Sequence, residues 1–383
     1  MALSLDGVRV LELARYQAGP RGGMILSDLG AEVIKIERLG GEETRHNPPV
    51  VRGQSVYFTV YNRGKKSICL DMRTPRGKAI FADLVKTADI VLENFRPGTM
   101  QTMGFGYDQL RALNKGIILV SVSGFGQYGP YTDRPAFDPL GQAMSGLMTL
   151  TGKPIGQPIG TASSIIDRTT ALHATIGALA ALRHRDRTGE GQVVDCCLLD
   201  SALTLVEIPT SYYLSTGEEG GESGRLPYRA KDGWVVIAAI GREMAANLMQ
   251  LVTGGTATDT SPISSGMTGA DQRRQMLDAW CAAHTTKEIV DALLELGVPV
   301  APVRTIPEAA ADPHLKAREM LVNMPDPVAG EIHVPGVAMK LSATPGQVGP
   351  VPTPGQHTDE VLGRLLGYDQ ATLDELRAAK VIG

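Results

Sequence analysis

Residues 8–37 read VRVLELARYQAGPRGGMILSDLGAEVIKIE, and this stretch decides the fold. Val8–Leu13 and Glu32–Glu37 are short runs rich in valine, leucine and isoleucine, which predicts two strands. Between them, Gly19–Leu29 is predicted to form a helix that stops at Gly30. A strand, a helix and another strand in this order indicate a parallel βαβ unit, because parallel neighbours need a helical crossover.

The same alternation continues up to about Leu205. Further strands are predicted at Ser67–Leu70, Ala88–Glu93, Ile117–Ser123 and Val193–Asp195. Further helices are predicted at Thr74–Thr87, at Tyr107–Leu113, and from the last strand through Leu205. Repeated units of this kind predict an α/β fold whose parallel sheet is covered by helices on both faces.

The pattern changes after a glycine-rich, acidic segment at Gly217–Gly224. A strand at Trp234–Ile240 and helical stretches at 242–252, 271–283 and 286–296 indicate a second, smaller α/β domain. The expected division is a large domain at 1–215 and 335–383, a small domain at 225–318, and linkers at 216–224 and 319–334.

Prolines crowd the connection that follows the small domain: Pro325, Pro327, Pro335, Pro345, Pro350, Pro352 and Pro354. They predict an extended, stiff connector. Such a connector either returns to the large domain or reaches across to a partner chain, and the sequence pattern leaves both possibilities open. A helical pair at 357–367 and 369–380 is predicted to follow it.

The composition narrows the classes of function. With 383 residues, 43% of them hydrophobic, the chain can form two domains with sizeable cores. A formal net charge of −4 argues against a nucleic-acid binder. Without a signal-peptide pattern or an apolar run of about 18 residues, we expect no membrane association and a cytoplasmic location. The four cysteines lack zinc-site spacing, so we expect reduced thiols and no bound metal.

Asp167 is the most informative single residue. It is the only acid between Asp138 and Asp186, and it stands where an amphipathic helix is predicted to begin. A carboxylate there can be a helix cap or an activated nucleophile, and a helix N-terminus stabilises the anion in both roles. His173, two turns further on, is expected to be a packed or surface group.

Two turns that follow predicted strands contain small residues. Gly124–Gly129 matches G-x-G-x-x-G, but Pro130 follows, so no helix opens to receive a pyrophosphate. A glycine-lined turn that approaches a ligand is the favoured interpretation. Gln17–Pro20 is either an ordinary turn or a place where a backbone amide and the Gln17 side chain meet a ligand.

Cations cluster after the early strands: Arg38, Arg63, Lys65, Lys66, Arg73, Arg76 and Lys78. A solvated face is the simpler interpretation of such a run. The alternative is a rim that binds the phosphates of a nucleotide.

Several stretches together resemble the family III CoA-transferases, which include formyl-CoA transferase and carnitine CoA-transferase. The stretches are Val10–Leu13, Gln17–Pro20, Asp28–Arg38, Asn62–Ser67 with Leu70 and Asp71, Ala88–Gly98, Met103–Gly106, Ser123–Pro130, Arg134–Asp138, Asp167 and Arg187–Asp195. They cover the first part of the chain almost without gaps, and Asp232–Ala238 adds a looser match.

The resemblance implies a covalent mechanism in which Asp167 is the nucleophile. Its carboxylate would attack an acyl-CoA thioester to give an anhydride and the CoA thiolate, the thiolate would return to form an aspartyl-CoA thioester, and an incoming acid would then receive CoA. Acyl-CoA and a small carboxylic acid are therefore the expected ligands, with CoA as a substrate and no tightly bound cofactor.

The resemblance also assigns binding positions, which are Gln17, Ala18, Arg38, Leu70, Arg73, Asn94, Phe95, Met103, Phe137 and Asp138. Gln17 and Ala18 would lie near the thioester, and Arg38 and Arg73 around the adenosine phosphates. Asn94, Phe95 and Met103 would line the adenine and pantetheine channel. The implied architecture is a Rossmann-like large domain, a smaller α/β domain and an interlocked homodimer.

Two alternatives remain. The same fold includes α-methylacyl-CoA racemases, which use a histidine, an aspartate and a glutamate; Phe137 and Gly241 stand at the histidine and glutamate positions, with Glu243 nearby. Phenylalanine cannot exchange a proton, so a transferase is favoured. The third possibility is a non-catalytic acyl-CoA binder.

Two features bear on the substrate. Gly217–Gly224 is the nearest match to the family's glycine loop over the nucleophile, although it is acidic. Arg225, Arg229 and Arg242 either pair with the far end of a dicarboxylate or are surface residues.

Overall fold

A computed structural model describes residues 2–220, 226–239, 241–254 and 270–383. The chain divides into two compact units. Unit 1 comprises Met1–Met148, Gly160–Thr210 and His314–Gly383, and unit 2 comprises Thr149–Ile159 and Ser211–Pro313. Among the described residues, no helix combines the length and apolar character needed to cross a membrane.

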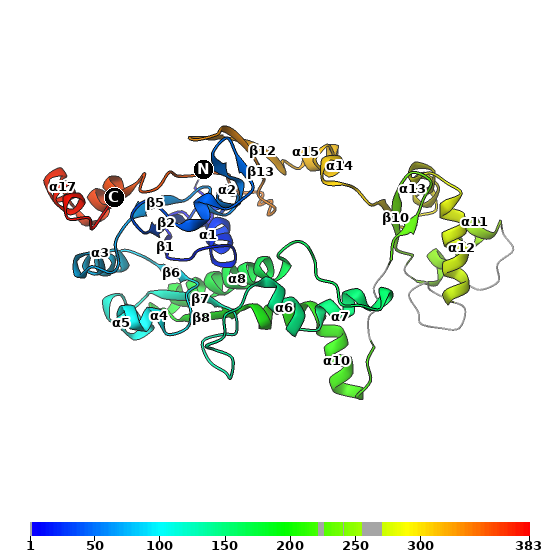
Figure 1. The fold of residues 1–383 in the computed structure, drawn as a ribbon, viewed down its shortest axis with the longest axis horizontal. Coiled ribbons are helices and arrows are strands. Elements are labelled where there is room, and N and C mark those ends of the chain that lie inside the picture. The colour runs from blue at the N-terminus through cyan, green and yellow to red at the C-terminus, as the bar shows by residue number, and fades with distance from the viewer. Residues whose placement is uncertain (1, 221–225, 240, 255–269) are drawn as a thin grey trace. The chain divides into compact units, whose positions relative to one another are not determined.

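Unit 1 contains a six-stranded parallel sheet in the order β5-β2-β1-β6-β7-β8 (Figure 1). Its strands are β1 (Arg9–Glu12), β2 (Glu32–Glu37), β5 (Lys66–Cys69), β6 (Ile90–Glu93), β7 (Ile118–Ser123) and β8 (Val193–Cys197). The chain builds outward from β1 through β2 to β5, and then outward in the other direction from β6 through β7 to β8. The strand order therefore reverses between β1 and β6, and the predicted α/β fold with a parallel sheet is confirmed.

Helices cover both faces of this sheet. They are α1 (Ala18–Asp28), α2 (Val56–Asn62), α3 (Pro75–Val85), α4 (Thr99–Met103), α5 (Tyr107–Leu113), α6 (Asp138–Met144), α8 (Ile165–Thr188), α9 (Leu198–Leu203), α16 (Thr358–Leu366) and α17 (Gln370–Ala378). Short 3-10 helices η1 (Glu43–His46) and η3 (Thr204–Val206) and a hairpin of β3 (Val50–Val51) and β4 (Gln54–Ser55) complete this set.

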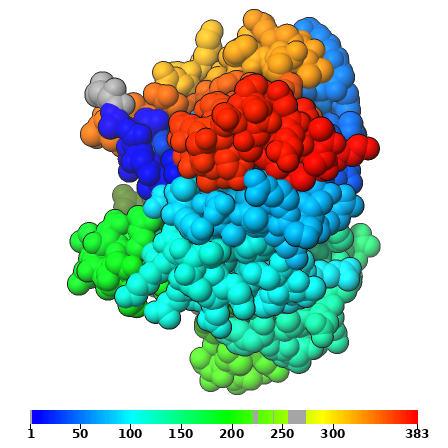
Figure 2. Space-filling view, turned by 90° about the vertical axis from the view of Figure 1, so that its left-hand side faces the viewer, coloured from blue at the N-terminus to red at the C-terminus, as the bar shows by residue number. Residues whose placement is uncertain are grey.

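Successive strand residues enter different cores because side chains alternate across a sheet. Leu11 packs in a core that also contains residues of α3, α5, α16 and α17. Val10 packs in a second core with residues of α1 and α8, where alanines such as Ala174 and Ala178 let the two helices approach closely. Figure 2 shows the C-terminal residues (red) lying against the light-blue segment that contains α3.

Unit 2 has a small antiparallel sheet of β9 (Tyr228–Arg229), β10 (Trp234–Ile237) and β11 (Val300–Pro302). Its core contains Val235, Leu248 and Leu293. The helices of this unit are η2 (Lys153–Ile155), α11 (Arg242–Thr253), α12 (Ala270–Ala282), α13 (Thr286–Glu295) and α14 (Ile306–Ala310). Helices α7 (Leu147–Gly152) and α10 (Glu207–Thr216) cross the unit boundaries, and α15 (Pro313–Ala317) belongs to unit 1 from His314 onward. The expected strand at Trp234–Ile240 ends at Ile237, and Ile240 itself lies outside the described residues.

The segment 319–334, expected as a linker, contains most of a hairpin. Strands β12 (Leu321–Asp326) and β13 (Gly330–Pro335) pair antiparallel. Met324 and Ile332 pack against Phe58 of α2. Proline is tolerated here because each strand of a two-stranded sheet has one edge that needs no N–H donor.

The connector after the hairpin returns to unit 1. Val351 lies in the same core as Phe58, and the Gly64 amide donates a hydrogen bond to the Pro350 carbonyl at 2.6 Å. The last residues also lie on the sheet, since the Asp71 amide donates to the Val381 carbonyl at 2.8 Å. Of the two possibilities left open by the sequence, the structure therefore shows the connector returning to the large domain of its own chain.

Candidate active site

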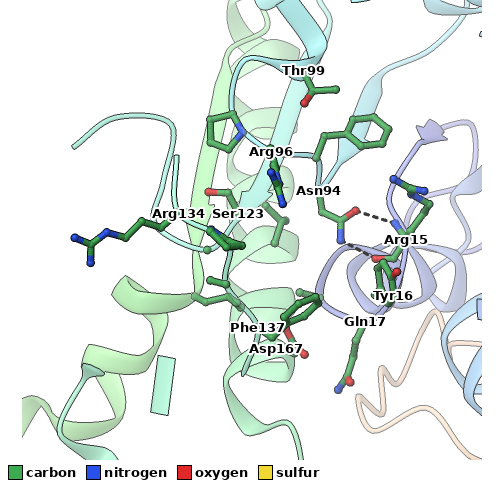
Figure 3. A pocket seen from close by; sticks show the side chains of 18 of the residues that line it. Arg15, Tyr16, Gln17, Asn94, Arg96, Thr99, Ser123, Arg134, Phe137 and Asp167 are labelled. Carbon is green, nitrogen blue, oxygen red and sulfur yellow. Dashed lines mark hydrogen bonds between the residues drawn. The ribbon is translucent and has the colours of Figure 1, made fainter. Parts of the chain in front are cut away.

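A cavity of about 500 Å³ lies at the carboxyl ends of β1, β6 and β7. Its walls are the loops Arg15–Ala18, Asn94–Pro97 and Val122–Gly124, together with Phe137 and Asp167 (Figure 3). These loops leave the strands on either side of the reversal in strand order. Ligands of open α/β sheets bind in the crevice outside such a reversal, so this cavity is the candidate active site.

A second cavity of about 630 Å³ lies next to the first, at the ends of β2 and β5. Arg38, Leu70, Arg73 and Met103 are among the residues that line it. Arg15 and Phe95 line both cavities, and the Arg15 guanidinium lies 5.6 Å from the centre of the Phe95 ring. Arg15 and Phe95 therefore form a wall that the two neighbouring cavities share.

Asp167 is the third residue of α8, and its side chain is half-buried in the wall of the first cavity. Ser164, rather than Asp167, occupies the N-cap position. Burial raises the pKa of the Asp167 carboxyl to about 7, and the negative charge of Asp138 adds to this effect. A carboxylate that is poorly solvated and near its pKa at neutral pH is suited to nucleophilic or proton-transfer chemistry.

Asp138 holds the start of α8. Its Oδ2 accepts hydrogen bonds from the amides of Ile166 at 2.6 Å and Asp167 at 2.9 Å. The Gln142 side-chain NH2 donates to the other oxygen, Oδ1, and the Gln142 side-chain oxygen, Oε1, accepts from the Thr161 backbone amide at 2.9 Å. Asp138, which is buried at the start of α6, thus does the work of a helix cap from outside the helix it caps.

Gln17 faces Asp167 across the cavity in the loop after β1. Its side chain is buried, and its Nε2 has no hydrogen-bond partner among the described residues. A buried amide without a partner is costly unless a ligand satisfies it. Asn94 fixes the same loop, because its side chain accepts from the Arg15 amide at 2.8 Å and donates to the Arg15 carbonyl at 2.6 Å (Figure 3).

The residues named from the sequence fall into two groups. Gln17, Ala18, Asn94, Phe95, Phe137 and Asp167 line the first cavity, and Arg38, Leu70, Arg73, Met103 and Phe95 line the second. Asp138 lines neither, because it lies behind Asp167 under the helix start. Phe137 is 62% exposed, with its ring 6.3 Å from that of Tyr16.

The cation cluster is neither a single solvated face nor a single phosphate rim. Arg38 and Arg73 line the second cavity, but Arg63 and Lys65 are buried ion-pair partners of Asp28 and Glu12. Burial of this kind depends on which strands become neighbours, so the local sequence could not predict it. Because Arg63 and Lys65 are buried and paired, they do not form part of a phosphate-binding surface.

Sequence reasoning missed Tyr57, Arg96 and Arg134, which also line the first cavity. Burial raises the pKa of the Tyr57 hydroxyl, which keeps it protonated as a hydrogen-bond donor. Among the described residues, neither Arg96 nor Arg134 forms an ion pair with a carboxylate, and Arg134 lies 3.8 Å from the centre of the Tyr131 ring. Arg96 could have been noted as a cation three residues after a predicted strand, whereas the local sequence gives no such signal for Tyr57 or Arg134.

Other candidates lie elsewhere. His173 forms a 3.0 Å hydrogen bond between its Nδ1 and the Ser201 hydroxyl. Arg229 lies 5.0 Å from the centre of the Trp234 ring, and Arg242 and Glu243 are exposed at the start of α11, all in unit 2. Arg225, and the part of Gly217–Gly224 beyond Gly220, lie outside the described residues.

Comparison with known proteins gives matches along the whole chain. The model of the family described as CoA-transferase family III matches residues 5–358. Succinyl-CoA–D-citramalate CoA-transferase of Chloroflexus aurantiacus is 40% identical, over 99% of this chain and 98% of that protein. Succinyl-CoA:glutarate CoA-transferase of Mus musculus is 34% identical over 99% and 90%. Formyl-CoA:oxalate CoA-transferase of Streptomyces avermitilis is 32% identical over 100% of both.

Solved structures with the same fold are also found. A CAIB/BAIF family protein from Brucella suis is 31% identical and superposes with a TM-score of 0.83, covering 95% of this chain and 100% of that one. A protein from Mycobacterium tuberculosis is 30% identical with a TM-score of 0.82, covering 93% and 98%.

Proposed function

This chain belongs to CoA-transferase family III and is an acyl-CoA:carboxylate CoA-transferase, and from that premise we propose that Asp167 is the nucleophile that carries the acyl group. The observation that supports the proposal most strongly is the state of this side chain. It is a poorly solvated carboxylate with a raised pKa, at the start of α8 and on the wall of the cavity at the strand-order reversal. Such a group reacts readily with a thioester once water is excluded.

The proposed reaction proceeds through two kinds of acyl-enzyme. An Asp167 oxygen attacks the thioester carbonyl of the donor, the C–S bond breaks, and a mixed anhydride and the CoA thiolate result. The thiolate attacks the Asp167 carbonyl of the anhydride, which releases the donor acid and leaves an aspartyl-CoA thioester. The acceptor carboxylate attacks this thioester to form a second anhydride, and the thiolate then takes the acceptor acyl group and frees Asp167.

Each intermediate needs a donor for its developing oxyanion. Gln17 lines the same cavity, and its Nε2 is buried and has no hydrogen-bond partner among the described residues, so we assign this role to it. The CoA nucleotide is assigned to the second cavity, with Arg38 and Arg73 near its phosphates, and the pantetheine arm passes Phe95 to reach Asp167.

The proposed donor is succinyl-CoA and the proposed acceptor a small dicarboxylic acid. Six of the similar proteins are named as succinyl-CoA transferases acting with citramalate, glutarate, malate or mesaconate. Arg96 and Arg134 line the first cavity without a carboxylate partner among the described residues, which suits the second carboxylate of such acids.

The assembly proposed is a homodimer in the cytosol. Helix α8 leaves Leu172 45% and Ile176 62% exposed, which favours cover by a second copy of the chain. The four cysteines are unpaired, which suits a reducing compartment.

Trapping of the acyl-enzyme tests the proposal. The enzyme incubated with succinyl-CoA and hydroxylamine should acquire a hydroxamate at Asp167, detected by peptide mass spectrometry, and should move CoA to dicarboxylates faster than to monocarboxylates of equal length. A racemase would exchange the α-proton of a 2-methylacyl-CoA with solvent instead, and a non-catalytic binder would do neither. An unmodified Asp167 peptide during turnover would refute the covalent role.

The dependence of the rate on pH should report Asp167. Because its pKa is raised to about 7, only the fraction of enzyme with an ionised Asp167 can attack. We expect kcat/KM to fall about tenfold per pH unit below pH 7 and to level off above it. The Kd of desulfo-CoA, which has no thioester to attack, should not show this dependence on pH. A kcat/KM that stays constant between pH 5 and 8 would contradict the assignment.

A further inference from the structure

A group of buried charges lies beneath the loop that carries Gln17. It consists of Glu12, Lys35, Asn62 and Lys65, here called the Glu12 cluster, and every member has 3% or less of its surface exposed. These residues come from β1, β2, α2 and the turn before β5. They lie in three of the sequence stretches that carried the family resemblance, and none of the four residues takes part in the proposed reaction.

Each lysine has all three of its protons engaged. Lys35 Nζ lies 3.2 Å from Glu12 Oε1, 2.8 Å from Glu42 Oε2 and 2.9 Å from the carbonyl of Ala14. Lys65 Nζ lies 2.7 Å from Glu12 Oε1, 3.0 Å from Asn62 Oδ1 and 2.8 Å from the carbonyl of Pro20. An ammonium group has three donors and no acceptor, so both are satisfied.

The two carbonyls in this set lie on either side of the catalytic loop. Ala14 comes immediately before Arg15–Ala18, the residues that line the first cavity, and Pro20 follows them in the first turn of α1. Between Ala14 and Pro20, the Asn94 side chain forms two hydrogen bonds with the Arg15 backbone. The loop is thus fastened at Ala14, Arg15 and Pro20.

The loop backbone needs such fastening. Tyr16, next to Gln17, has a φ of 66°, a left-handed conformation that is unfavourable for a residue with a side chain and persists only where the surroundings enforce it. The fit beneath the loop is also tight, because a Cβ added at Gly23 would lie 1.8 Å from Glu12 Oε2. The start of α1 therefore rests directly on the Glu12 cluster.

We propose that Lys35 and Lys65 are positioning residues: through the carbonyls of Ala14 and Pro20 they hold the Gln17 side-chain amide at the reacting carbonyl. The inference rests on the proposed role of Gln17 as oxyanion donor. Buried ion pairs are seldom the most stable filling for a protein interior, so their presence here fits a geometric task. A displacement of about 1 Å at a catalytic group can lower a rate by about 10²-fold.

A matched control lies at the other end of the same helix. Arg63 and Asp28 form a buried ion pair at the C-terminal end of α1, and both are as inaccessible to solvent as the Glu12 cluster. No hydrogen bond of Arg63 reaches the loop 14–20. Arg63→Met therefore reproduces the loss of a buried ion pair under α1 without releasing the loop.

The test compares Lys65→Met with Arg63→Met in hydrogen exchange and in kinetics. Lys65→Met should raise deuterium uptake in the peptide spanning 13–21 at least about tenfold, lower kcat about 10²-fold and leave the Kd for CoA within about threefold. Arg63→Met should destabilise the protein and raise exchange at the other end of α1, with kcat within about threefold of wild type. Glu12→Gln serves as a second variant if Lys65→Met does not fold. It keeps the size of the side chain and one oxygen for the two lysines, which both contact Glu12 Oε1, but removes the negative charge, and we expect a smaller change of the same kind.

A double-mutant cycle separates this inference from the proposed function. If Lys65 acts through Gln17, Lys65→Met should cost less than about threefold in kcat when Gln17→Ala is already present. Fully additive losses, or unchanged exchange in the loop, would overturn the positioning role while Gln17 keeps its own. A Gln17→Ala enzyme with normal kcat would instead remove Gln17 from the mechanism and, with it, the catalytic consequence proposed for Lys35 and Lys65.

Discussion

Asp167→Asn should lower kcat for CoA transfer by at least about 10⁴-fold and leave the Kd for CoA within about tenfold. The amide has nearly the shape of the carboxylate but cannot form the anhydride, and the nucleophile contributes little to ground-state affinity. The measurements are steady-state transfer from succinyl-CoA and calorimetric titration with CoA. Asp186→Asn provides the control, because Asp186 is an exposed acid on the same helix, α8, and its loss should leave the rate unchanged.

The same variant should be more stable than the wild type at pH 8. The pKa of Asp167 in the folded protein, about 7, lies above its ordinary value of 3.8. The folded protein therefore binds more protons than the unfolded chain between these values, so the contribution of this group to stability falls as pH rises through the window. Removal of the charge should raise the free energy of unfolding by about 1–3 kcal/mol at pH 8, with little change at pH 4. A variant that retains transfer, or one that is less stable at pH 8, would contradict this view of Asp167.

Asp138→Ala should reduce kcat by about 10²-fold and lower stability by about 1–3 kcal/mol. It leaves the amides of Ile166 and Asp167 without their acceptor in a buried place, and the start of α8 then loses its fixed position. Thermal unfolding and kcat measured on the same preparations test both effects.

Asp138→Asn separates the capping role of this residue from its charge. The asparagine oxygen still accepts from both amides, but the negative charge that helps to raise the pKa of Asp167 is gone. We expect kcat well above that of Asp138→Ala, and an acid limb of the pH–rate profile that moves to lower pH. Equal rates in the alanine variant and the wild type would show that the cap is dispensable; an unmoved limb in the asparagine variant would show that Asp138 does not influence the ionisation of Asp167.

Much of the fold could be predicted because local pattern and tertiary environment agree. Glu32–Glu37 and Tyr107–Leu113 have the same bounds in the sequence prediction and in the structure. The first is a strand buried along almost its full length, and Val33, Ile34 and Ile36 identify it as a strand. The burial of its charged residues Lys35 and Glu37 does not follow from the sequence, because it depends on the partners that these side chains meet. The hairpin β12–β13 was missed because its prolines argue against a strand, and only its two-stranded form accommodates them.

A site residue could be predicted where the sequence alone marks it as unusual. It could not be predicted where its role depends on tertiary contacts between elements that are distant in the sequence. Asp167 could be singled out as an isolated acid at a helix start. The capping of α8 by Asp138 depends on how α6 approaches it, and the burial of Lys65 depends on β5 lying beside β2. Tyr57 and Arg134 are far from Asp167 in the sequence, and no local signal places them in one cavity.

Because the strand order reverses between β1 and β6, the two proposed ligands, the nucleotide of CoA and the carboxylic acid, are assigned to different halves of one sheet. The cavity assigned to the nucleotide is built mainly by the β1–β2–β5 half, and the cavity that contains Asp167 draws the loops after β6 and β7 from the other half. Substitutions in the loop after β7 are thus expected to change the specificity for the acid and to leave the affinity for CoA unchanged. Related enzymes can therefore differ in the carboxylic acid they accept while the residues assigned to CoA binding stay the same.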